Sequence, residues 1–130
     1  MSNTSRQILR YSLALLFIWF GCQQIFEPAV WLGFLPEWTG YLLVPREMLV
    51  RANGWFEIMA AIFLAVGVFT RPTALILSLH LFSIAAETGG AIGVRDSVLA
   101  MASLALAASE PDSWTVDSRC RRLERPVDAA

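Results

Sequence analysis

The sequence predicts an all-α protein: an integral membrane four-helix antiparallel bundle with an interfacial loop between its first two helices. Three observations lead to this fold class. Of the 130 residues, 56% are hydrophobic and only 16% are charged, whereas soluble domains average about a quarter charged. The mean hydropathy is +0.55. Finally, four apolar segments are joined by two short turns and one longer loop, which is typical of antiparallel helices.

The first apolar segment, residues 8–26, is long enough for one crossing at about 20 residues per span, and Pro28 ends it. It contains no small-residue cleavage site, so we expect a retained helix rather than a signal peptide. Residues 29–41 hold two Trp, two Gly and one Pro. This segment is too interrupted for a span, and its Trp and Tyr rings favour a loop at the headgroup zone of the membrane.

The second span is expected to begin between residues 45 and 48 and to end at residue 70. Arg71 and Pro72 then form a turn, with Pro72 well placed in the first turn of the third helix. That helix, residues 73–87, is short. The Gly-containing stretch of residues 88–90 ends it.

A fourth helix is expected from residue 93 or 94 to residue 109, with Asp96 in its first turn, where the helix dipole favours a carboxylate. Residues 1–109 therefore form the predicted transmembrane domain. Residues 110–130 are polar and are expected to form a mobile or surface-lying cytoplasmic tail.

The arginines predict the orientation of the chain, because cytoplasmic flanks collect basic residues. One side carries seven arginines: Arg6, Arg10, Arg71, Arg119, Arg121, Arg122 and Arg125. The other side carries three: Arg46, Arg51 and Arg95. Both termini are therefore expected to be cytoplasmic.

Glu57 lies inside an otherwise apolar span, where an ionised side chain costs at least about 2.5 to 3.5 kcal/mol. It should therefore face protein or a water-filled cavity. Asn53 shares its helix face, and His80 and Glu87 share one stripe of the third helix. These spacings predict a polar pocket that opens toward the outer leaflet. The remaining expected members, which wall or cap the pocket or lie at its depth, are Trp19, Gln23, Gln24, Arg51, Trp55, Arg95 and Asp96.

A purely structural interpretation of these polar residues stays open. Arg51 is one turn from Glu47, and Arg95 is close enough in sequence to pair with Glu87. Such charges at a membrane edge often anchor helices. Likewise, a neutral His80 hydrogen-bonded to a neighbouring helix would need no further function.

Several other kinds of site are not indicated. The net charge of -1 gives no reason to expect a nucleic-acid partner, and the single His and scattered carboxylates lack metal-ligand spacing. Ligation of haem by His80 alone stays open. The sequence contains no phosphate-binding Gly-rich loop, no CxxC pair and no nucleophile elbow. Cys22 and Cys120 are expected to be two unpaired thiols.

Four stretches resemble the DoxX family of small four-helix bacterial membrane proteins. They are LRYSLALLFIWFG, NGWFEIMAAIFLAVGVFTR, PTALILSLHL and GVRDSVLAMASLALA, which together span nearly all of residues 9–108. The resemblance implies a multi-pass protein of the bacterial cytoplasmic (inner) membrane that takes part in a redox or oxidative-stress system. A related type in this family is the membrane subunit of a thiosulfate:quinone oxidoreductase.

The resemblance also implies a bound, non-covalent quinone. Glu57 and His80 would exchange protons with its oxygens, Trp19 and Trp55 would flank its ring, and the remaining pocket residues would contact it: Gln23, Arg51, Asn53, Glu87 and Arg95. Electrons would come from a redox partner subunit or a small reductant, and the Ala-rich fourth helix leaves a homo-oligomer open. The alternative is a non-enzymatic membrane scaffold or a small-solute carrier.

Overall fold

The computed structural model describes residues 1–124, and this part of the chain is helical, without β-strands. In chain order its elements are α1 (Asn3–Phe26), α2 (Pro28–Trp31), the 3₁₀-helices η1 (Leu32–Phe34) and η2 (Glu37–Tyr41), α3 (Arg46–Val66), α4 (Thr70–Thr88), α5 (Gly90–Ala108) and α6 (Val116–Leu123). The predicted all-α class is confirmed. Residues 125–130, which include Arg125 and the end of the predicted tail, lie outside the described residues.

Local chemistry explains where the helix ends differ from the sequence-based boundaries. α1 begins earlier than expected because the Ser2 hydroxyl accepts a hydrogen bond from the Ser5 amide and so caps the helix. α3 ends earlier than expected, at Val66, because Gly67 adopts the left-handed conformation that commonly ends a helix (φ 78°). Pro72 lies in the first turn of α4, as predicted.

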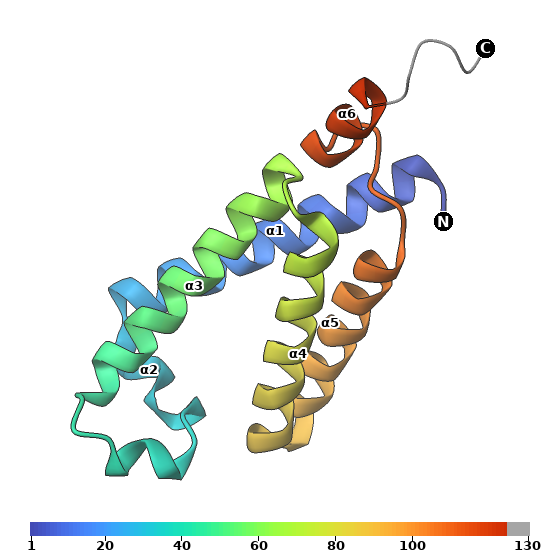
Figure 1. Cartoon of the computed structure of the whole chain (residues 1–130). Coiled ribbons are helices and arrows are strands. Elements are labelled where there is room, and N and C mark those ends of the chain that lie inside the picture. The colour runs from blue at the N-terminus through green and yellow to red at the C-terminus, as the bar shows by residue number, and fades with distance from the viewer. Residues whose placement is uncertain (125–130) are drawn as a thin grey trace.

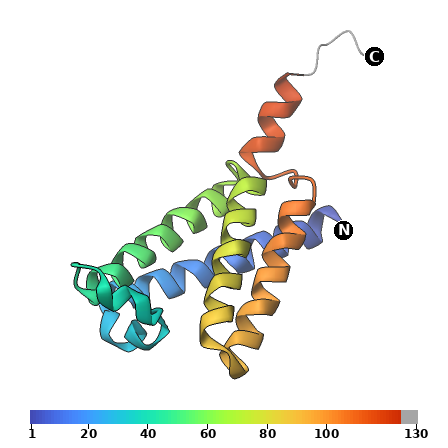
Figure 2. The ribbon, with the colours of Figure 1, turned by 60° about the horizontal axis from the view of Figure 1, so that its bottom comes forward.

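The four long helices form two packed pairs. α1 packs along α3, and α4 packs along α5. Figures 1 and 2 show the pairs meeting near the α3–α4 turn, below α6, and spreading apart toward their opposite ends, where α2, η1 and η2 lie beside α1 and α3. We call these two ends of the molecule the α6 end and the α2 end.

Apolar side chains both fill the interior and cover the outside of the molecule. The buried core takes small and branched residues from all four long helices: Leu13, Ala14, Phe17, Ala60, Ala61, Leu64, Ala74, Leu77, Leu81, Ala100, Leu106 and Ala107. α1, α3 and α5 are each long and apolar enough to cross a membrane. Outward-facing side chains such as Leu15 (69% exposed) and Leu79 (62% exposed) remain apolar, as a lipid-facing surface requires. The chain is a membrane protein.

Two glycines set the distance between α1 and α3. A Cβ atom added to Gly21 would lie 2.6 Å from the carbonyl oxygen of Gly54, and one added to Gly54 would lie 2.7 Å from the carbonyl oxygen of Gly21. The two backbones therefore touch where the helices cross, as small residues permit in membrane proteins. Gln24, Asn53 and Glu57 lie within one turn of this crossing, so the same contact brings their side chains together.

At the α6 end, Arg10 is completely buried. Its Nε donates to Asp112 Oδ2 (2.7 Å) and its Nη2 donates to Asp112 Oδ1 (3.2 Å). Its Nη1 donates to the carbonyl oxygens of Leu64 (2.6 Å) and Ala65 (2.7 Å), which lie in the last turn of α3 and lack partners within the helix. Arg10 is thus a structural link between α1, α3 and the chain after α5, rather than only a flanking charge.

Residues 110–124 differ from the expected mobile or surface-lying tail. Asp112 and Thr115 are buried, and Thr115 packs directly against Gly67. The Asp117 carboxylate accepts hydrogen bonds from the amides of Phe69 (2.9 Å) and Thr70 (2.8 Å), so it caps the start of α4. Asp112, Thr115 and Asp117 are thus held in place by hydrogen bonds and packing, whereas α6 has no buried residue and lies on the surface.

An exposed ion pair also belongs to this segment. Arg121 Nη1 donates to Glu110 Oε2 at 2.6 Å, and both side chains are more than half exposed. The hydrogen bond from Arg121 and its positive charge lower the pKa of Glu110 from its ordinary value. Because solvent screens such pairs, this one contributes little to stability.

Replacing Arg10 by Gln should strongly destabilise the protein, because it leaves the buried Asp112 carboxylate without both of its guanidinium donors and two carbonyl oxygens without their donor. Breaking a buried pair from one side costs about 3–5 kcal/mol. The measurement is the unfolding midpoint of purified protein in detergent micelles. Arg121→Gln, which breaks the exposed pair, is the matched control and should melt like the wild type. A wild-type midpoint for Arg10→Gln would contradict the structural role of this link.

Replacing Gly54 by Ala should destabilise the protein by about 1–3 kcal/mol, the usual cost of overpacking, because the added methyl group meets the backbone of α1. Helix propensity alone predicts the opposite sign, a gain of about 1 kcal/mol. The control is Gly33→Ala, since a Cβ atom at Gly33 meets nothing within 4 Å. If Gly54→Ala raised the unfolding midpoint, the close crossing would not limit the packing of α1 on α3.

Candidate functional site

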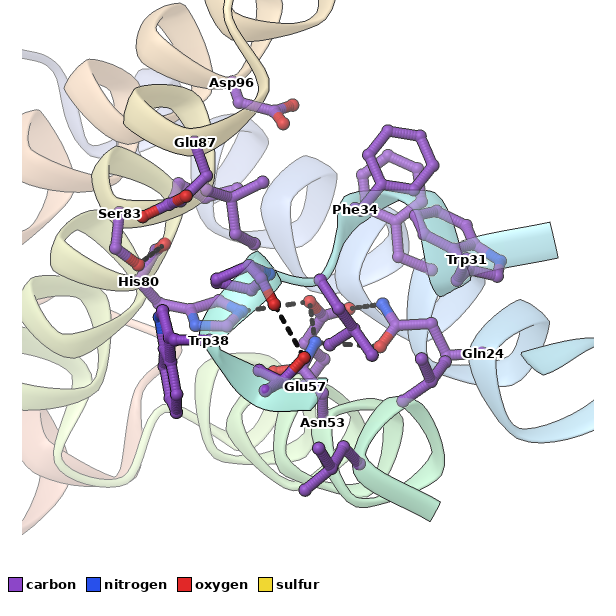
Figure 3. A pocket seen from close by; sticks show the side chains of 18 of the residues that line it. Gln24, Trp31, Phe34, Trp38, Asn53, Glu57, His80, Ser83, Glu87 and Asp96 are labelled. Carbon is purple, nitrogen blue, oxygen red and sulfur yellow. Dashed lines mark hydrogen bonds and ion pairs between the residues drawn. The ribbon is translucent and has the colours of Figure 1, made fainter. Parts of the chain in front are cut away.

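Four polar side chains from three helices meet in the interior at the α2 end. Gln24 comes from α1, Asn53 and Glu57 come from α3, and His80 comes from α4; we call them the Glu57 group. Figure 3 shows their side chains converging, joined by hydrogen bonds. Glu57 is 2% exposed. The sequence-based expectation that Glu57 faces protein or a cavity is therefore correct.

The carboxylate of Glu57 is well supplied with donors. Gln24 Nε2 donates to Oε2 (2.9 Å), Asn53 Nδ2 donates to Oε1 (3.1 Å), and His80 Nε2 lies 3.2 Å from Oε1. Asn53 Nδ2 also donates to Gln24 Oε1 (2.8 Å), which fixes the orientation of both amides. An ionised carboxylate only accepts hydrogen bonds, so this arrangement suits a charged Glu57 away from water.

His80 is the more exposed member of the Glu57–His80 pair. Its side chain is 20% exposed, whereas that of Glu57 is 3% exposed. When Nε2 carries hydrogen it donates to Glu57, and when the ring takes a second proton the two residues form an ion pair. The edge of the ring also contacts Phe56, with centroids 5.1 Å apart. The carboxylate and imidazole can therefore hold a proton between them without leaving an isolated charge.

The Glu57 group lines a cavity of about 390 Å³, which is large enough for a small ligand. Its walls come from α1, α3, α4, α5 and the segment of residues 31–42. Aromatic side chains form much of the apolar surface, and some of them pack on one another. Phe20 and Trp31 meet edge to face at 5.6 Å between centroids, and Trp31 and Phe34 lie 5.3 Å apart. Trp38 lines the cavity from η2.

A second polar region of the cavity comes from the α4–α5 hairpin. Ser83 and Glu87 line it from α4, and Arg95 and Asp96 line it from α5. Arg95 Nε donates to Asp96 Oδ1 at 2.8 Å, and the guanidinium carbon lies 5.4 Å from the centre of the Phe20 ring. The expected pairing of Arg95 with Glu87 is therefore wrong: the neighbouring Asp96 takes this role, because it lies inside the cavity wall.

The structure brings together five of the nine predicted site residues. Those that line the cavity are Asn53, Glu57, His80, Glu87 and Arg95. Gln23 and Arg51 lie outside the lining, and Arg51 is exposed. Gln24, rather than its neighbour Gln23, bonds to Glu57, because residues 17, 21 and 24 form the buried stripe of α1. The chemical roles of these residues are not decided by their positions and stay predictions.

The expectation that Trp19 and Trp55 wall the pocket is wrong. Trp19 is 62% exposed and Trp55 is 58% exposed, and neither lines the cavity. Helix geometry explains this, because two residues correspond to about 200° of rotation. Trp55 is two residues from Glu57 and therefore points to the opposite face of α3. Trp19 lies two residues from the buried Phe17 and likewise points outward.

The aromatic walls that sequence reasoning missed are Phe20, Trp31, Phe34 and Trp38. The last three belong to the segment expected to be an interfacial loop, which instead folds into α2, η1 and η2 along the cavity. The sequence shows that this segment is rich in Trp, but it does not show which surface of the protein those side chains pack against. Helix periodicity says nothing about which wall an irregular segment covers.

Neither cysteine takes part in this site. Cys22 and Cys120 are both free thiols, as predicted. Within residues 1–124, no three His, Cys, Asp or Glu side chains are grouped so that they could hold a metal ion.

Comparison with known proteins identifies one family. The model of the DoxX family matches residues 5–90, which contain nearly all of α1 and the whole of α3 and α4, including every member of the Glu57 group. The chain matches no curated protein and no solved structure. Because the matched segment covers well over half of the sequence and agrees with the resemblance of its apolar stretches, the chain belongs to the DoxX family.

Proposed function

We propose that this DoxX protein binds a quinone in the cavity and acts as the quinone-interacting membrane component of a redox or oxidative-stress system. One observation carries the proposal: a buried carboxylate bonded to an imidazole lines an aromatic cavity inside an apolar helical protein. Quinones combine a flat apolar ring with oxygens that take up protons. The cavity offers matching surfaces for both parts of such a ligand.

The walls support a flat ring. Trp31, Phe34 and Trp38 supply apolar faces, and they replace Trp19 and Trp55 as the residues that would flank it. The volume of about 390 Å³ lies within the range of small-molecule sites, about 300–1,000 Å³. Figure 3 shows the labelled aromatic side chains and the Glu57 group around the same space.

The Glu57 group supplies the proton chemistry of the proposal. A bound quinone accepts two electrons and two protons when it is reduced. His80 is the more exposed partner and donates the two protons to the quinone oxygens one after the other, taking up a new proton from water between the two transfers, while the Glu57 carboxylate stabilises the protonated imidazole. Gln24 and Asn53 hold the carboxylate in place during this exchange. The electrons come from a redox partner subunit.

The proposal places the chain in the bacterial inner membrane, as an antiparallel four-helix bundle with both termini in the cytoplasm. Within residues 1–124, six arginines flank the helix ends near α6 and three lie toward the α2 end, which matches the tendency of basic residues to stay inside. α2, η1 and η2 then lie at the outer interface, where their Trp side chains are favoured. A homo-oligomer is compatible with the Ala residues on α5.

Tryptophan fluorescence tests where the quinone binds. A short-chain ubiquinone analogue added to the detergent-solubilised protein should quench Trp31 and Trp38, which line the cavity, more than the outward-facing Trp19 and Trp55. Trp31→Phe and Trp38→Phe should each reduce the saturable part of the quenching. The matched controls Trp19→Phe and Trp55→Phe should leave it unchanged. If only Trp19→Phe and Trp55→Phe reduced the saturable quenching, the ligand would bind outside the cavity.

Replacing Glu57 by Gln tests the proton chemistry. This variant keeps the size of the side chain but removes its charge. The rate at which an electron donor reduces the quinone should therefore fall at least about a hundredfold, the usual contribution of a positioned acid or base. The measurement is quinone reduction in native membranes, together with mass spectrometry of quinone that copurifies with the protein. Glu47→Gln is the control, because Glu47 is exposed and lies outside the cavity lining.

A second candidate is a non-enzymatic scaffold or small-solute carrier, and one observation favours it. The three donors to Glu57 all come from the protein itself, as in a purely structural tie between helices. In that case Glu57→Gln and His80→Ala would both lower the unfolding midpoint, no quinone would copurify, and reduction rates per folded protein would be unchanged. Proteoliposome flux measurements would then test the carrier version.

A further inference from the structure

Asp96 is a second buried carboxylate in the wall of the same cavity. It lies on α5, a helix long and apolar enough to span a membrane, and it is 2% exposed. Figure 3 shows its carboxylate separated from the Glu57 group. An ionisable side chain in such a position is costly unless it is paired or used.

The two carboxylates differ in how many donors they have. The carboxylate of Glu57 is contacted by three side chains from three helices. Among residues 1–124, Asp96 accepts one side-chain hydrogen bond, from Arg95 Nε to Oδ1, and its Oδ2 accepts none. A carboxylate oxygen that lies in a cavity wall without a side-chain donor is a place where a ligand can supply one.

Arg95 determines the charge that such a ligand should carry. Its guanidinium neutralises Asp96 and also lies against the Phe20 ring, 5.4 Å from the ring centre. Since the pair carries no net charge, it attracts a cationic group only weakly, and the other carboxylate of this region, Glu87, is exposed, so solvent screens its charge. A neutral hydroxyl group, which brings a hydrogen-bond donor without a charge, fits both the free oxygen and the apolar surroundings.

We propose that Asp96 accepts a hydrogen bond from a ring hydroxyl, and that the cavity therefore binds the reduced, dihydroxy form of its ligand, a hydroquinone, more tightly than the oxidised quinone. This inference rests on the proposed quinone site. A quinone carries only acceptor oxygens, which would face the lone pairs of Asp96 Oδ2. A para-hydroquinone carries donors at both ends of a flat ring, which suits a cavity with two separate polar regions.

A matched pair of ligands tests the proposal on the wild-type protein. The first is a short-chain hydroquinone kept reduced under anaerobic conditions, and the second is its 1,4-dimethyl ether, which keeps the ring but lacks both hydroxyl donors. Each competes with the quinone that quenches tryptophan fluorescence. The hydroquinone should bind about ten- to a hundredfold more tightly than the ether, as expected for a hydrogen bond to a charged acceptor. Equal affinities would overturn the proposal.

Variants of Asp96 test whether this residue causes the preference for hydroquinone over quinone. Asp96→Asn presents donor hydrogens to the ligand, so it should reduce the preference for hydroquinone over quinone at least about tenfold, while Asp96→Glu keeps the acceptor and should retain most of it. Glu47→Gln is the control outside the cavity. If folded Asp96→Asn kept the full preference for hydroquinone over quinone, the role of Asp96 would be wrong. If Asp96→Asn does not fold, loss of that preference in Asp96→Glu would overturn the role instead.

The outcomes also separate this inference from the proposed function. If neither quinone, hydroquinone nor ether binds, the quinone site itself is wrong and the inference fails with it. If quinone binds and is displaced equally well by both competitors, the quinone site stands and only the preference for the reduced form is wrong. The unfolding midpoint of each variant in detergent shows whether a lost preference reflects a local change or a loss of structure.

Discussion

The interaction on which the α2 end of this protein depends is the set of hydrogen bonds to Glu57. A carboxylate within an apolar helix must find donors that do not come from water. Here they come from Gln24, Asn53 and His80, which lie on α1, α3 and α4. These three helices must therefore come close to one another at the depth of Glu57. The contact between Gly21 and Gly54 makes that approach possible for α1 and α3. The cavity forms beside this point, where the two helix pairs spread apart.

The two ends of the molecule use buried charge differently. At the α6 end, Arg10 and Asp112 form a bidentate pair, and Arg10 Nη1 donates to two carbonyl oxygens at the end of α3. That link is completely buried, and it holds the helix pairs where they meet. At the α2 end, Glu57 and Asp96 both face a cavity. Rigid anchoring at one end leaves the opposite end free to shape a binding site.

The proposed ligand fits the physical character of the whole chain. The outer surface is apolar over the spans, so a lipophilic molecule dissolved in the bilayer reaches the protein directly. Inside the cavity, the two buried carboxylates each have a basic side chain beside them: His80 beside Glu57 and Arg95 beside Asp96. A neutral ring with polar ends therefore suits the site better than a free ion, which would have to leave water and cross an apolar wall.

The sequence by itself determined the all-α class, the number of long helices, the family, and the expectation that Glu57 faces the protein interior. These properties follow from composition and helix length, which the membrane constrains directly. It did not determine which surfaces meet. Trp19 and Trp55 were predicted as walls because they are close in sequence to polar residues, but helical rotation turns them outward. Only the tertiary structure decided that the irregular segment between α1 and α3 covers the cavity and that Asp112 bonds to Arg10. Such contacts join residues far apart in the chain, and no local periodicity encodes them.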